Sequence, residues 1–399
     1  MAKVHSKALD QSITVDRIIG HIRGSKQGPT VVFIAGIHGN EPSGVFALHE
    51  VFRRLQPLAN DLSGNFYGVA GNLWALERGV RFEENDLNRL WLQDRINQLD
   101  DGTFEPVNED ERQQADIYQT VKQIISTESG PFYFMDLHST SSPSIPFMTV
   151  NDSLLNRHYT SQYPLPIVLG IEEYLDGPIL SYMNELGYVA FGYEGGQHDD
   201  LAAIDNHIAF ISLSLAYTGI AKKQQVDFDL HFERLSGLSR NLKRMYEIHF
   251  RYKIESGERF TMKPGFVNFQ YIPKGCILAT SDGVDITNSK RSRIFMPLYQ
   301  SQGIDGYFVI RRIPPFFLWL SAMLRRMRAD KLLPILPGVK WTDSLHETLE
   351  VNIKVARFLA KDIFHLLGYR YKKLDESHWI MKNREERSRS VEYVHSSWY

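Results

Sequence analysis

One short apolar run constrains the fold of this chain more than any other segment. Residues 30–36 read Thr-Val-Val-Phe-Ile-Ala-Gly, without polar alternation. Such β-branched runs are typical of a strand that is buried on both faces. A helix is predicted directly afterwards, over residues 42–55, because Pro42 suits a first helical turn and the apolar residues of this segment share one face.

The same alternation of strand and helix recurs along the first half of the chain. Helices are predicted at 115–126 and 205–219, where apolar residues recur at helical spacing. Alternating strands and helices favour a mostly parallel sheet with helices on both faces, so we predict the α/β class. The further strands are predicted at 65–71, 132–137, 166–171 and 188–193.

The chain has 399 residues, which favours more than one domain. We predict an α/β domain over 1–225, a β-rich domain over 226–312 and a helical C-terminal extension over 313–399. After a helix at 233–245, short segments separated by turn residues indicate the β-rich part. The extension includes an amphipathic helix at 345–367, and the polar tail after residue 376 is expected to be poorly ordered. The short strands are predicted at 246–255, 266–271, 275–280, 294–299 and 307–310.

Composition argues against several classes of function. The formal net charge is -2, whereas nucleic-acid-binding proteins usually carry a positive excess. The apolar stretch at 313–324 is too short to span a bilayer, and residues 1–14 lack the apolar core of a signal peptide. The single cysteine, Cys276, fits a reducing compartment. We therefore expect a cytoplasmic protein without stable membrane insertion, and leave a homo-oligomer open.

Polar residues that suit a metal site follow three of the predicted strands. His38 and Glu41 come after the strand at 30–36, His138 after the strand at 132–137 and Glu194 after the strand at 188–193. The carboxyl ends of parallel strands meet at one edge of a sheet. Two histidines and one glutamate are the protein ligands of a class of catalytic zinc sites, and a further glutamate can act as a general base. Taken alone, His38 and Glu41 equally suit a loop histidine and a glutamate favoured by the helix dipole.

A second cluster consists of Arg81 and the run Asp86-Leu-Asn-Arg89, which lies on a predicted loop. One interpretation is a solvated surface loop. The other is an arginine that stabilises an oxyanion, together with an Asn-Arg pair that binds a substrate carboxylate. His198, after Glu194, is open to two similar interpretations, a substrate or metal contact and the polar start of a helix.

These motifs occur in an order that resembles a known family. Over residues 17–312 the chain is similar to the succinylglutamate desuccinylase/aspartoacylase family, which belongs to the zinc carboxypeptidase-like hydrolases. That family has a mixed sheet flanked by helices and a small β domain that narrows the channel to the active site. The motifs that carry the resemblance are Gly36-Ile-His-Gly-Asn-Glu41, Asn72 with Arg81, Asp86-Leu-Asn-Arg89, Asp136-Leu-His138, Glu194-Gly-Gly-Gln197 and Met296-Pro-Leu-Tyr-Gln300 through Gly306-Tyr-Phe308.

The resemblance implies hydrolysis of the amide bond of an N-acyl amino acid or a similar small amide by an enzyme with one Zn²⁺ per chain. Glu194 would activate the attacking water and Arg81 would stabilise the oxyanion. Asn72 and Asp86 would support the substrate shell, and a tyrosine of the β domain would reach the substrate. The implied zinc ligands are His38, Glu41 and His138, and the implied substrate-binding residues are Asn72, Asn88, Arg89 and Tyr307, with Tyr299 as a second candidate for the tyrosine.

The sequence departs from the family at one place. Aspartoacylases carry an extra arginine about ten residues before the catalytic glutamate, whereas residues 181–193 contain neither arginine nor lysine and Asn184 stands near that position. This argues against N-acetylaspartate as the substrate. Two other functions stay open: a zinc carboxypeptidase or peptide amidase that acts on short peptides, and a ligand-binding protein without enzymatic activity.

Overall fold

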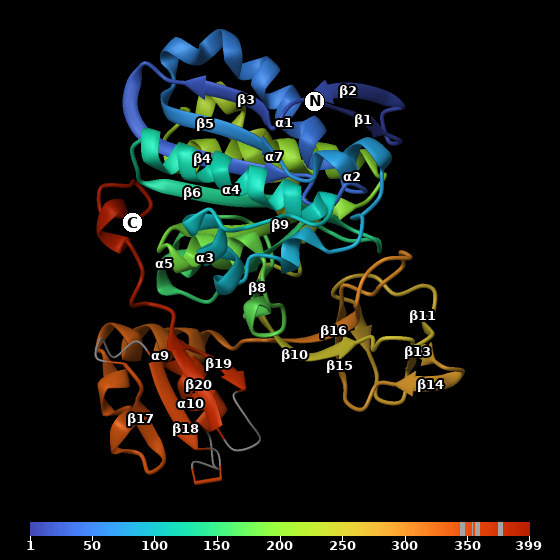
Figure 1. Ribbon diagram of the computed structural model, residues 1–399, viewed down its shortest axis with the longest axis vertical. Coiled ribbons are helices and arrows are strands. Elements are labelled where there is room, and N and C mark those ends of the chain that lie inside the picture. Colours follow the sequence, from blue (N-terminus) through green and yellow to red (C-terminus); the bar gives the residue numbers. More distant parts are fainter. Residues whose placement is uncertain (344–347, 353, 356–359, 374–377) are drawn as a thin grey trace.

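The computed structural model describes residues 1–343, 348–352, 354–355, 360–373 and 378–399. Its centre is a mixed sheet of eleven strands, in the order β12-β15-β16-β10-β8-β7-β9-β6-β4-β5-β3 (Figure 1). This sheet and its flanking helices confirm the predicted α/β class. The four strands at its heart run parallel to one another: β4 (Lys26–Ala35), β5 (Ser63–Ala70), β6 (Phe132–Thr140) and β9 (Val189–Gln197).

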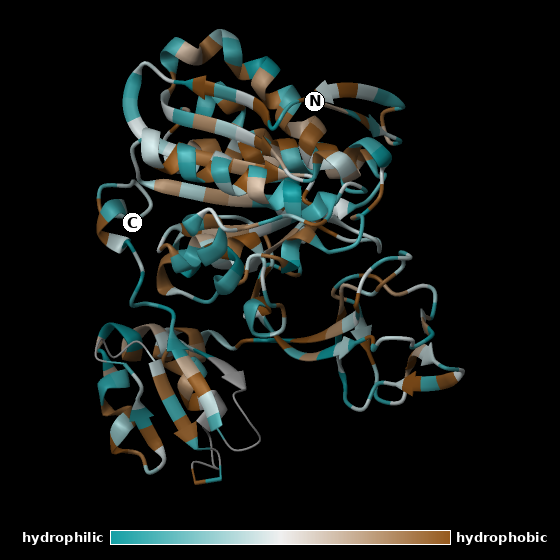
Figure 2. Ribbon diagram, in the orientation of Figure 1, coloured by the Kyte–Doolittle hydropathy of each residue, from teal (hydrophilic) through white to brown (hydrophobic). Residues whose placement is uncertain are grey.

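The apolar run at 30–36 supplies the buried part of β4. Val31 and Phe33 belong to the hydrophobic cluster on one face of the sheet, and Val32 and Ile34 belong to the cluster on the other face. All four side chains are fully buried. Figure 2 shows brown, hydrophobic residues interspersed with paler ones along the strands of the central sheet. A strand covered on both faces has no side on which a polar residue is favoured, which explains the lack of alternation.

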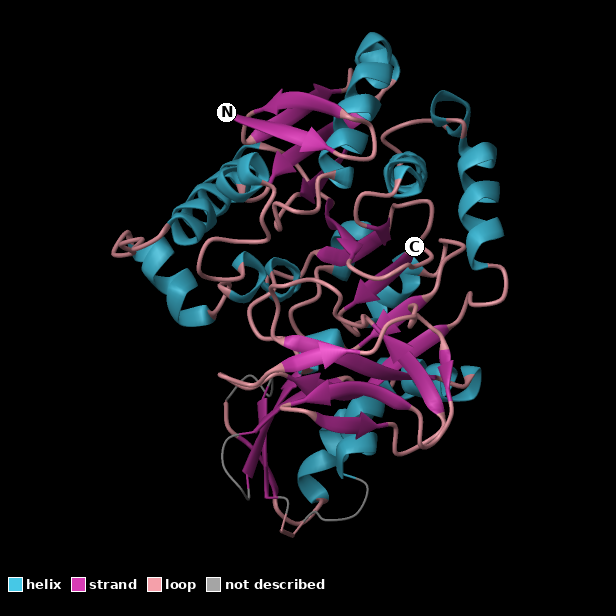
Figure 3. Cartoon of the chain, turned by 90° about the vertical axis from the view of Figure 1, so that its right-hand side faces the viewer, coloured by secondary structure: helices cyan, strands magenta, loops and turns pink. Residues whose placement is uncertain are grey.

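Helices cover both faces of the sheet, as the view in Figure 3 shows. One cluster joins the sheet to α1, α5, α7 and α8, and the other joins it to α3, α4 and α6. Two layers of helices around a buried sheet enclose two separate cores. The helices are α1 (Ser43–Leu55), α2 (Leu73–Arg78), α3 (Gln93–Asp101), α4 (Glu109–Thr127), α5 (Leu154–Thr160), α6 (Ile179–Glu185), α7 (Leu201–Thr218) and α8 (Phe228–Ser239).

The central sheet continues into the segment predicted to be β-rich. β10 (Met245–Lys253) pairs parallel with β8 (Ile167–Leu169) and antiparallel with β16 (Asp305–Arg312). The predicted strand at 266–271 is wrong, because Phe269 has a φ of 65°, which interrupts an extended backbone. The division of the chain near residues 225 and 312 stays our proposal. The other strands of this part are β11 (Phe260–Met262), β12 (Tyr271–Ile272), β13 (Ile277–Ser281), β14 (Val284–Thr287) and β15 (Ser292–Phe295), and those of the N-terminal half are β1 (Ala2–Ser6), β2 (Gln11–Val15), β3 (Ile18–Arg23) and β7 (Phe147–Val150).

The C-terminal extension differs from the helical segment that was predicted. It contains α9 (Pro315–Arg326) and α10 (Ala360–Leu366), but also a four-stranded antiparallel sheet. Part of the predicted helix at 345–367 falls on residues 345–347, 353 and 356–359, which lie outside the described residues. Within that range, residues 348–352 alternate between buried and partly exposed positions and form a strand, a short period that the longer helical pattern concealed. The strands are β17 (Val339–Trp341), β18 (Thr348–Asn352), β19 (Tyr369–Lys373) and β20 (His378–Asn383).

The tail of the chain returns to the α/β domain, where the C-terminus lies beside β6 (Figure 1). Trp398 is buried and its indole donates a hydrogen bond of 2.9 Å to the hydroxyl of Tyr133 on β6. Tyr393 is also buried and accepts a 3.0 Å bond from the backbone of Val189 on β9. The expectation of a poorly ordered tail is therefore wrong for residues 378–399, because its aromatic residues pack into the core. Residues 374–377 lie outside the described part.

Candidate metal centre and active site

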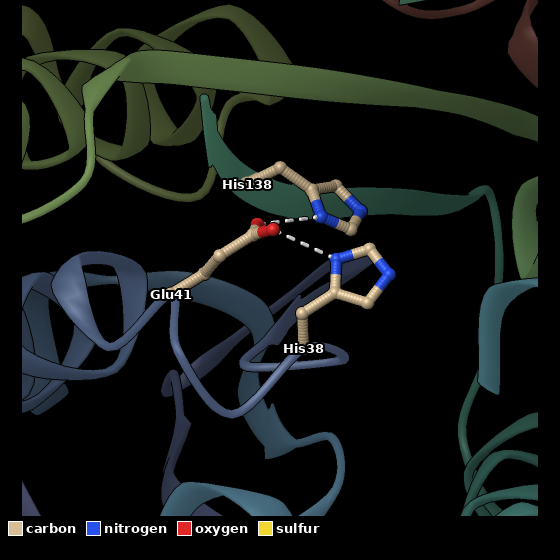
Figure 4. Close-up of side chains that lie close together, drawn as sticks. All are labelled: His38, Glu41 and His138. Atoms are coloured by element: carbon tan, nitrogen blue, oxygen red, sulfur yellow. Dashed lines mark hydrogen bonds and ion pairs between the residues drawn. The ribbon is translucent and has the colours of Figure 1, made fainter. Parts of the chain in front are cut away.

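The three predicted metal ligands meet at the carboxyl end of the parallel strands (Figure 4). His38 and Glu41 lie on the loop between β4 and α1, and His138 lies on β6, which pairs with β4. Nδ1 of His38 lies 2.9 Å from Oε1 of Glu41, and Nδ1 of His138 lies 3.1 Å from Oε2. One donor atom from each residue lies within 4.8 Å of the others, and all three side chains are buried. The arrangement can hold one metal ion.

Glycine permits the tight path of the ligand loop. A Cβ atom on Gly39 would lie 2.0 Å from the carbonyl carbon of Ala75 on α2. No larger residue therefore fits at position 39, between His38 and Glu41. Gly36, at the end of β4, has a φ of 75°, which turns the chain out of the strand. The sequence Gly-x-His-Gly-x-Glu thus folds into a loop that directs His38 and Glu41 toward β6.

Each histidine is held by a second carboxylate on its far nitrogen. Nε2 of His38 lies 3.1 Å from Oδ1 of Asp86, and Nε2 of His138 lies 2.6 Å from Oδ2 of Asp136. A neutral imidazole that donates its Nε2 proton to the aspartate has a lone pair on Nδ1 for a metal ion. Metal-bound histidines commonly donate their other N–H to a carboxylate in this way. The donor set therefore fits a divalent ion such as Zn²⁺.

Glu41 remains a carboxylate in this surrounding. Burial by itself would raise its pKa, but the neighbouring imidazoles of His38 and His138 hold the pKa well below its ordinary value. Its Oε2 also accepts a hydrogen bond of 3.1 Å from the backbone of Ser139. A carboxylate that stays ionised is the form that binds a metal.

Glu194 lies on β9 in register with His138 of β6. Its side chain is buried, and Oε2 has no hydrogen-bond partner among the described residues. Burial raises the pKa of this carboxyl to about 8; the charge of His138 opposes the shift and that of Glu41 adds to it. A buried carboxyl with an unused oxygen beside a metal site is suited to exchange a proton with a bound molecule.

Arg81 faces the same site from the loop after α2. Its Nη1 donates a 3.1 Å hydrogen bond to Oε1 of Glu41, and its Nη2 donates a 3.2 Å bond to Oδ2 of Asp86. Its Nε is buried and has no partner within the described part of the chain. The guanidinium is thus fixed beside the candidate metal ligands, and its Nε is unused by the described residues.

Asn88 and Arg89 lie on the short helix η2 (Leu87–Arg89), which Asp86 caps with a 2.9 Å bond from the backbone of Asn88. The Asn88 amide lies 3.5 Å from Nε2 of His138 and accepts a 3.0 Å bond from the backbone of Ile179. Arg89 donates a 3.1 Å bond to Asp305 on β16. The pair is therefore held between the metal ligands and β16.

Seven of the nine predicted site residues line one cavity of about 130 Å³. Asn72 and Tyr307 are not among the described residues of its wall. Tyr307 is buried in the β-rich part, where its ring stacks on Tyr252 at 5.5 Å between centroids, and Tyr299 is also absent from the wall. The seven residues are His38, Glu41, Arg81, Asn88, Arg89, His138 and Glu194.

Asn72 acts on the site through Asp110. Its side chain caps α2 by accepting a 3.0 Å bond from the backbone of Ala75, and its amide donates a 2.7 Å bond to Asp110. The carboxylate of Asp110 also accepts bonds from the backbone of Glu83, Glu84 and Asn85. It thereby fixes the loop between Arg81 and Asp86. The sequence pattern gave no sign of Asp110, because it lies among other acidic residues at the start of α4.

His198 also belongs to the wall of the cavity, at the end of β9 rather than within a helix. Its Nδ1 lies 2.7 Å from the hydroxyl of Ser139 and its Nε2 lies 3.2 Å from Oε1 of Gln300. Burial lowers its pKa, which disfavours the charged form of the ring. Gln300 lies in the Met296–Gln300 motif, which was the one available sign that this segment reaches the site.

Comparison with known proteins agrees with this picture. Residues 27–209 match the family described as the succinylglutamate desuccinylase/aspartoacylase catalytic domain. A probable aspartoacylase of Prochlorococcus marinus is 38% identical over 69 residues, which cover 17% of this chain and 22% of that protein. A probable aspartoacylase of a Nostoc species is 26% identical over 114 residues, which cover 28% and 35%. The chain thus spans about a quarter to a third of the length of the curated relatives it matches.

Solved structures share the fold at low identity. A succinylglutamate desuccinylase/aspartoacylase of Rhodobacter sphaeroides superposes with a TM-score of 0.52 and 15% identity, covering 73% of this chain and 88% of that one. A succinylglutamate desuccinylase of a Silicibacter species has a TM-score of 0.52 and 14% identity, covering 78% and 93%. The resemblance first drawn from the motifs is confirmed over residues 27–209, which match the succinylglutamate desuccinylase/aspartoacylase catalytic domain.

Proposed function

We propose that this protein is a zinc-dependent amidohydrolase that cleaves the amide bond of an N-acyl amino acid or a similar small carboxylate-bearing amide. The observation that carries the proposal is one cavity that combines a His-Glu-His donor set with the unpartnered carboxyl oxygen of Glu194. The match of residues 27–209 to the succinylglutamate desuccinylase/aspartoacylase catalytic domain supports the same reaction. The cofactor is one Zn²⁺ per chain.

His38, Glu41 and His138 would hold the ion, because imidazole and carboxylate donors suit Zn²⁺ and both imidazoles have a carboxylate on the other nitrogen. Bound Zn²⁺ supplies Lewis-acid chemistry, which polarises an amide carbonyl and makes water a nucleophile near neutral pH.

Glu194 is the general base in this proposal. Its unused Oε2 accepts a proton from the attacking water and then donates it to the departing amine nitrogen. The reaction forms a carbon–oxygen bond, breaks the carbon–nitrogen bond and consumes one water. Burial raises the pKa of Glu194, which suits this carboxyl to carry the proton from the water to the amine.

The arginines act on opposite ends of the substrate. Arg81 directs a fixed guanidinium, with an unused Nε, at the metal site and stabilises the oxyanion that develops on the carbonyl oxygen. Arg89 and Asn88 bind the substrate carboxylate, since a guanidinium beside an amide forms strong charge-assisted hydrogen bonds with carboxylates.

We place the protein in the cytoplasm, because a chain with a single cysteine fits a reducing compartment. The net charge of -2 argues against a nucleic-acid partner, so we propose that the protein acts on small molecules. Among the described helices, none has the length and apolarity needed to cross a bilayer. The cavity of about 130 Å³ favours small amides over long peptides.

The test compares metal content and hydrolysis in four proteins: native, His38→Ala, Glu194→Gln and His49→Ala. His49 is an exposed histidine on α1 and serves as the matched control. We expect about one Zn²⁺ per chain in all but His38→Ala, and turnover of N-acyl amino acids only by native and His49→Ala. Zinc retention by His38→Ala would contradict the ligand set, and turnover by Glu194→Gln would remove Glu194 from the reaction. Cleavage of short peptides alone would favour a carboxypeptidase, and zinc binding without turnover would favour a ligand-binding protein.

A further inference from the structure

The wall of the cavity beside Asn88 and Arg89 is apolar. Leu180, at the start of α6, and Leu175, on the loop before it, both line the cavity and are largely buried. Phe308 of β16 closes the same side and is 2% exposed. Ile171, Pro178 and Ile304 complete this wall.

This wall is tied directly to the residues that would bind the substrate carboxylate. The backbone of Ile179, next to Leu180, donates to Oδ1 of Asn88, and the carbonyl of Gly177 accepts a 3.1 Å bond from the backbone of Trp91. A Cβ atom on Gly177 would lie 2.2 Å from the carbonyl oxygen of Arg89. A group attached to the same carbon as the bound carboxylate therefore faces the apolar wall.

Among its described lining residues, the cavity offers no second cation for a second carboxylate. Among its described lining residues, Arg81 and Arg89 are the permanent cations, and four carboxylates accompany them: Glu41, Asp86, Glu194 and Asp305. Arg81 is already bonded to two of these carboxylates, and Arg89, which is bonded to Asp305, would take up the first carboxylate of the substrate. A further carboxylate on the wall would be buried without a partner, which is strongly unfavourable.

The polar residues of α6 do not change this. The Asn184 amide donates a 2.7 Å bond to the carbonyl of Leu180 and a 3.0 Å bond to that of Ala190. Asn184 and Ser181 line a different cavity, on the side of the C-terminal unit. Among the described residues of α6, Leu180 is the one that lines the cavity with His38, Glu41 and His138.

We propose that the substrate carries one carboxylate and an apolar side chain, so that the enzyme hydrolyses N-acyl derivatives of aliphatic or aromatic amino acids in preference to those of aspartate or glutamate. This inference rests on the proposed amidohydrolase function. Leu175, Leu180 and Phe308 are its specificity-determining residues, because they contact the side chain of the amino acid.

The test is a panel in which the acyl group is constant: N-acetyl-leucine, N-acetyl-phenylalanine, N-acetyl-aspartate and N-acetyl-glutamate, assayed with zinc-loaded native protein. We expect kcat/KM to be at least about 100-fold higher for the apolar pair, since unpaired burial of a charge gives discrimination of this order or more. Equal or higher kcat/KM for the acidic pair would overturn the inference and leave the amidohydrolase function intact. If neither pair is hydrolysed by zinc-loaded protein, the proposed function itself is contradicted.

Two variants test the placement of the side chain. Leu180→Arg is expected to raise the ratio of kcat/KM for N-acetyl-aspartate over N-acetyl-leucine at least about tenfold, because it supplies the missing cation. Leu180→Ala, the matched control, is expected to lower turnover of N-acetyl-leucine without raising that of N-acetyl-aspartate. An unchanged ratio in Leu180→Arg that retains zinc and the native unfolding midpoint would overturn the placement. If that variant does not fold, Leu175→Arg provides the same comparison on the neighbouring side chain.

Discussion

Asp110 lies outside the cavity but anchors the loop that carries residues of the proposed active site, and Asp110→Asn tests this role. Its two carboxylate oxygens accept hydrogen bonds from four donors. These are the Asn72 amide at 2.7 Å and the backbone N–H groups of Glu83, Glu84 and Asn85 at 3.1, 2.8 and 2.9 Å. Asp110 itself is fully buried. An asparagine has one acceptor oxygen, so its NH₂ group must face at least one of these donors.

The expected loss follows from that count. One hydrogen bond to a charged group is lost, which costs about 1.5–3 kcal/mol, and the other three change from charge-assisted to neutral bonds. We expect the free energy of unfolding to fall by about 3 kcal/mol. The loop from Arg81 to Arg89 loses its anchor, and a misplacement of about 1 Å in catalytic groups costs on the order of 100-fold in rate.

Urea unfolding and kcat on an N-acyl amino acid, with zinc content as a check on the metal ligands, measure both effects. Glu109→Gln is the matched control: it removes a negative charge from the same helical turn, but its carboxylate pairs with Arg112 at the surface. We expect the control to change stability by less than about 1 kcal/mol, as for a surface ion pair. If Asp110→Asn behaves like the control in both assays, the anchoring role of Asp110 is refuted.

Three further predictions follow from single contacts. Arg81→Gln should keep zinc and lose about 10²- to 10³-fold in kcat, as for loss of an oxyanion donor; steady-state kinetics with near-native kcat would exclude that role. In chelator-treated protein, Glu194→Gln should lose less stability than native between pH 5 and pH 8. Burial raises the pKa of Glu194 from its ordinary value of 4.5 to about 8, so the folded native protein binds this proton more tightly than the unfolded chain does and is destabilised as the proton leaves. If the melting temperatures of native protein and Glu194→Gln change by the same amount between pH 5 and pH 8, this shift in the pKa of Glu194 is contradicted. Trp398→Ala should lower the free energy of unfolding by about 3–5 kcal/mol, because the indole is buried against Tyr133; a change below about 1 kcal/mol in urea unfolding would refute the packing of the tail.

Strand patterns alone located the parts of the site that follow buried strands. The run at 30–36 has a pattern typical of parallel strands, and the residues after such a strand lie at the carboxyl edge of the sheet. His38, Glu41 and His138 could therefore be predicted to converge before any coordinates were known. Asp86 could be linked to the site by its motif, although its contact with Nε2 of His38 could not.

Other contacts depend on chain segments that meet in space far from each other in sequence. Asp305 contacts Arg89 because β16 joins the edge of the central sheet through β10, a pairing that short strand patterns do not specify. Tyr307 was assigned to the substrate because it lies in a family-like motif, but alternation along β16 directs it into the β-rich core and directs Phe308 to the cavity. The C-terminal sheet was missed because its strands are short and lie within a helix-like pattern.

The most direct test of the central claim is hydrolysis of the N-acetyl amino acid panel by native protein and Glu194→Gln, with zinc quantified in the same samples. We predict about one Zn²⁺ per chain in both proteins and turnover by the native protein alone, with removal of the metal abolishing turnover and its return restoring it. Zinc-loaded native protein that releases no amino acid from any N-acyl substrate, or a Glu194→Gln variant that is as active as native, would contradict the claim.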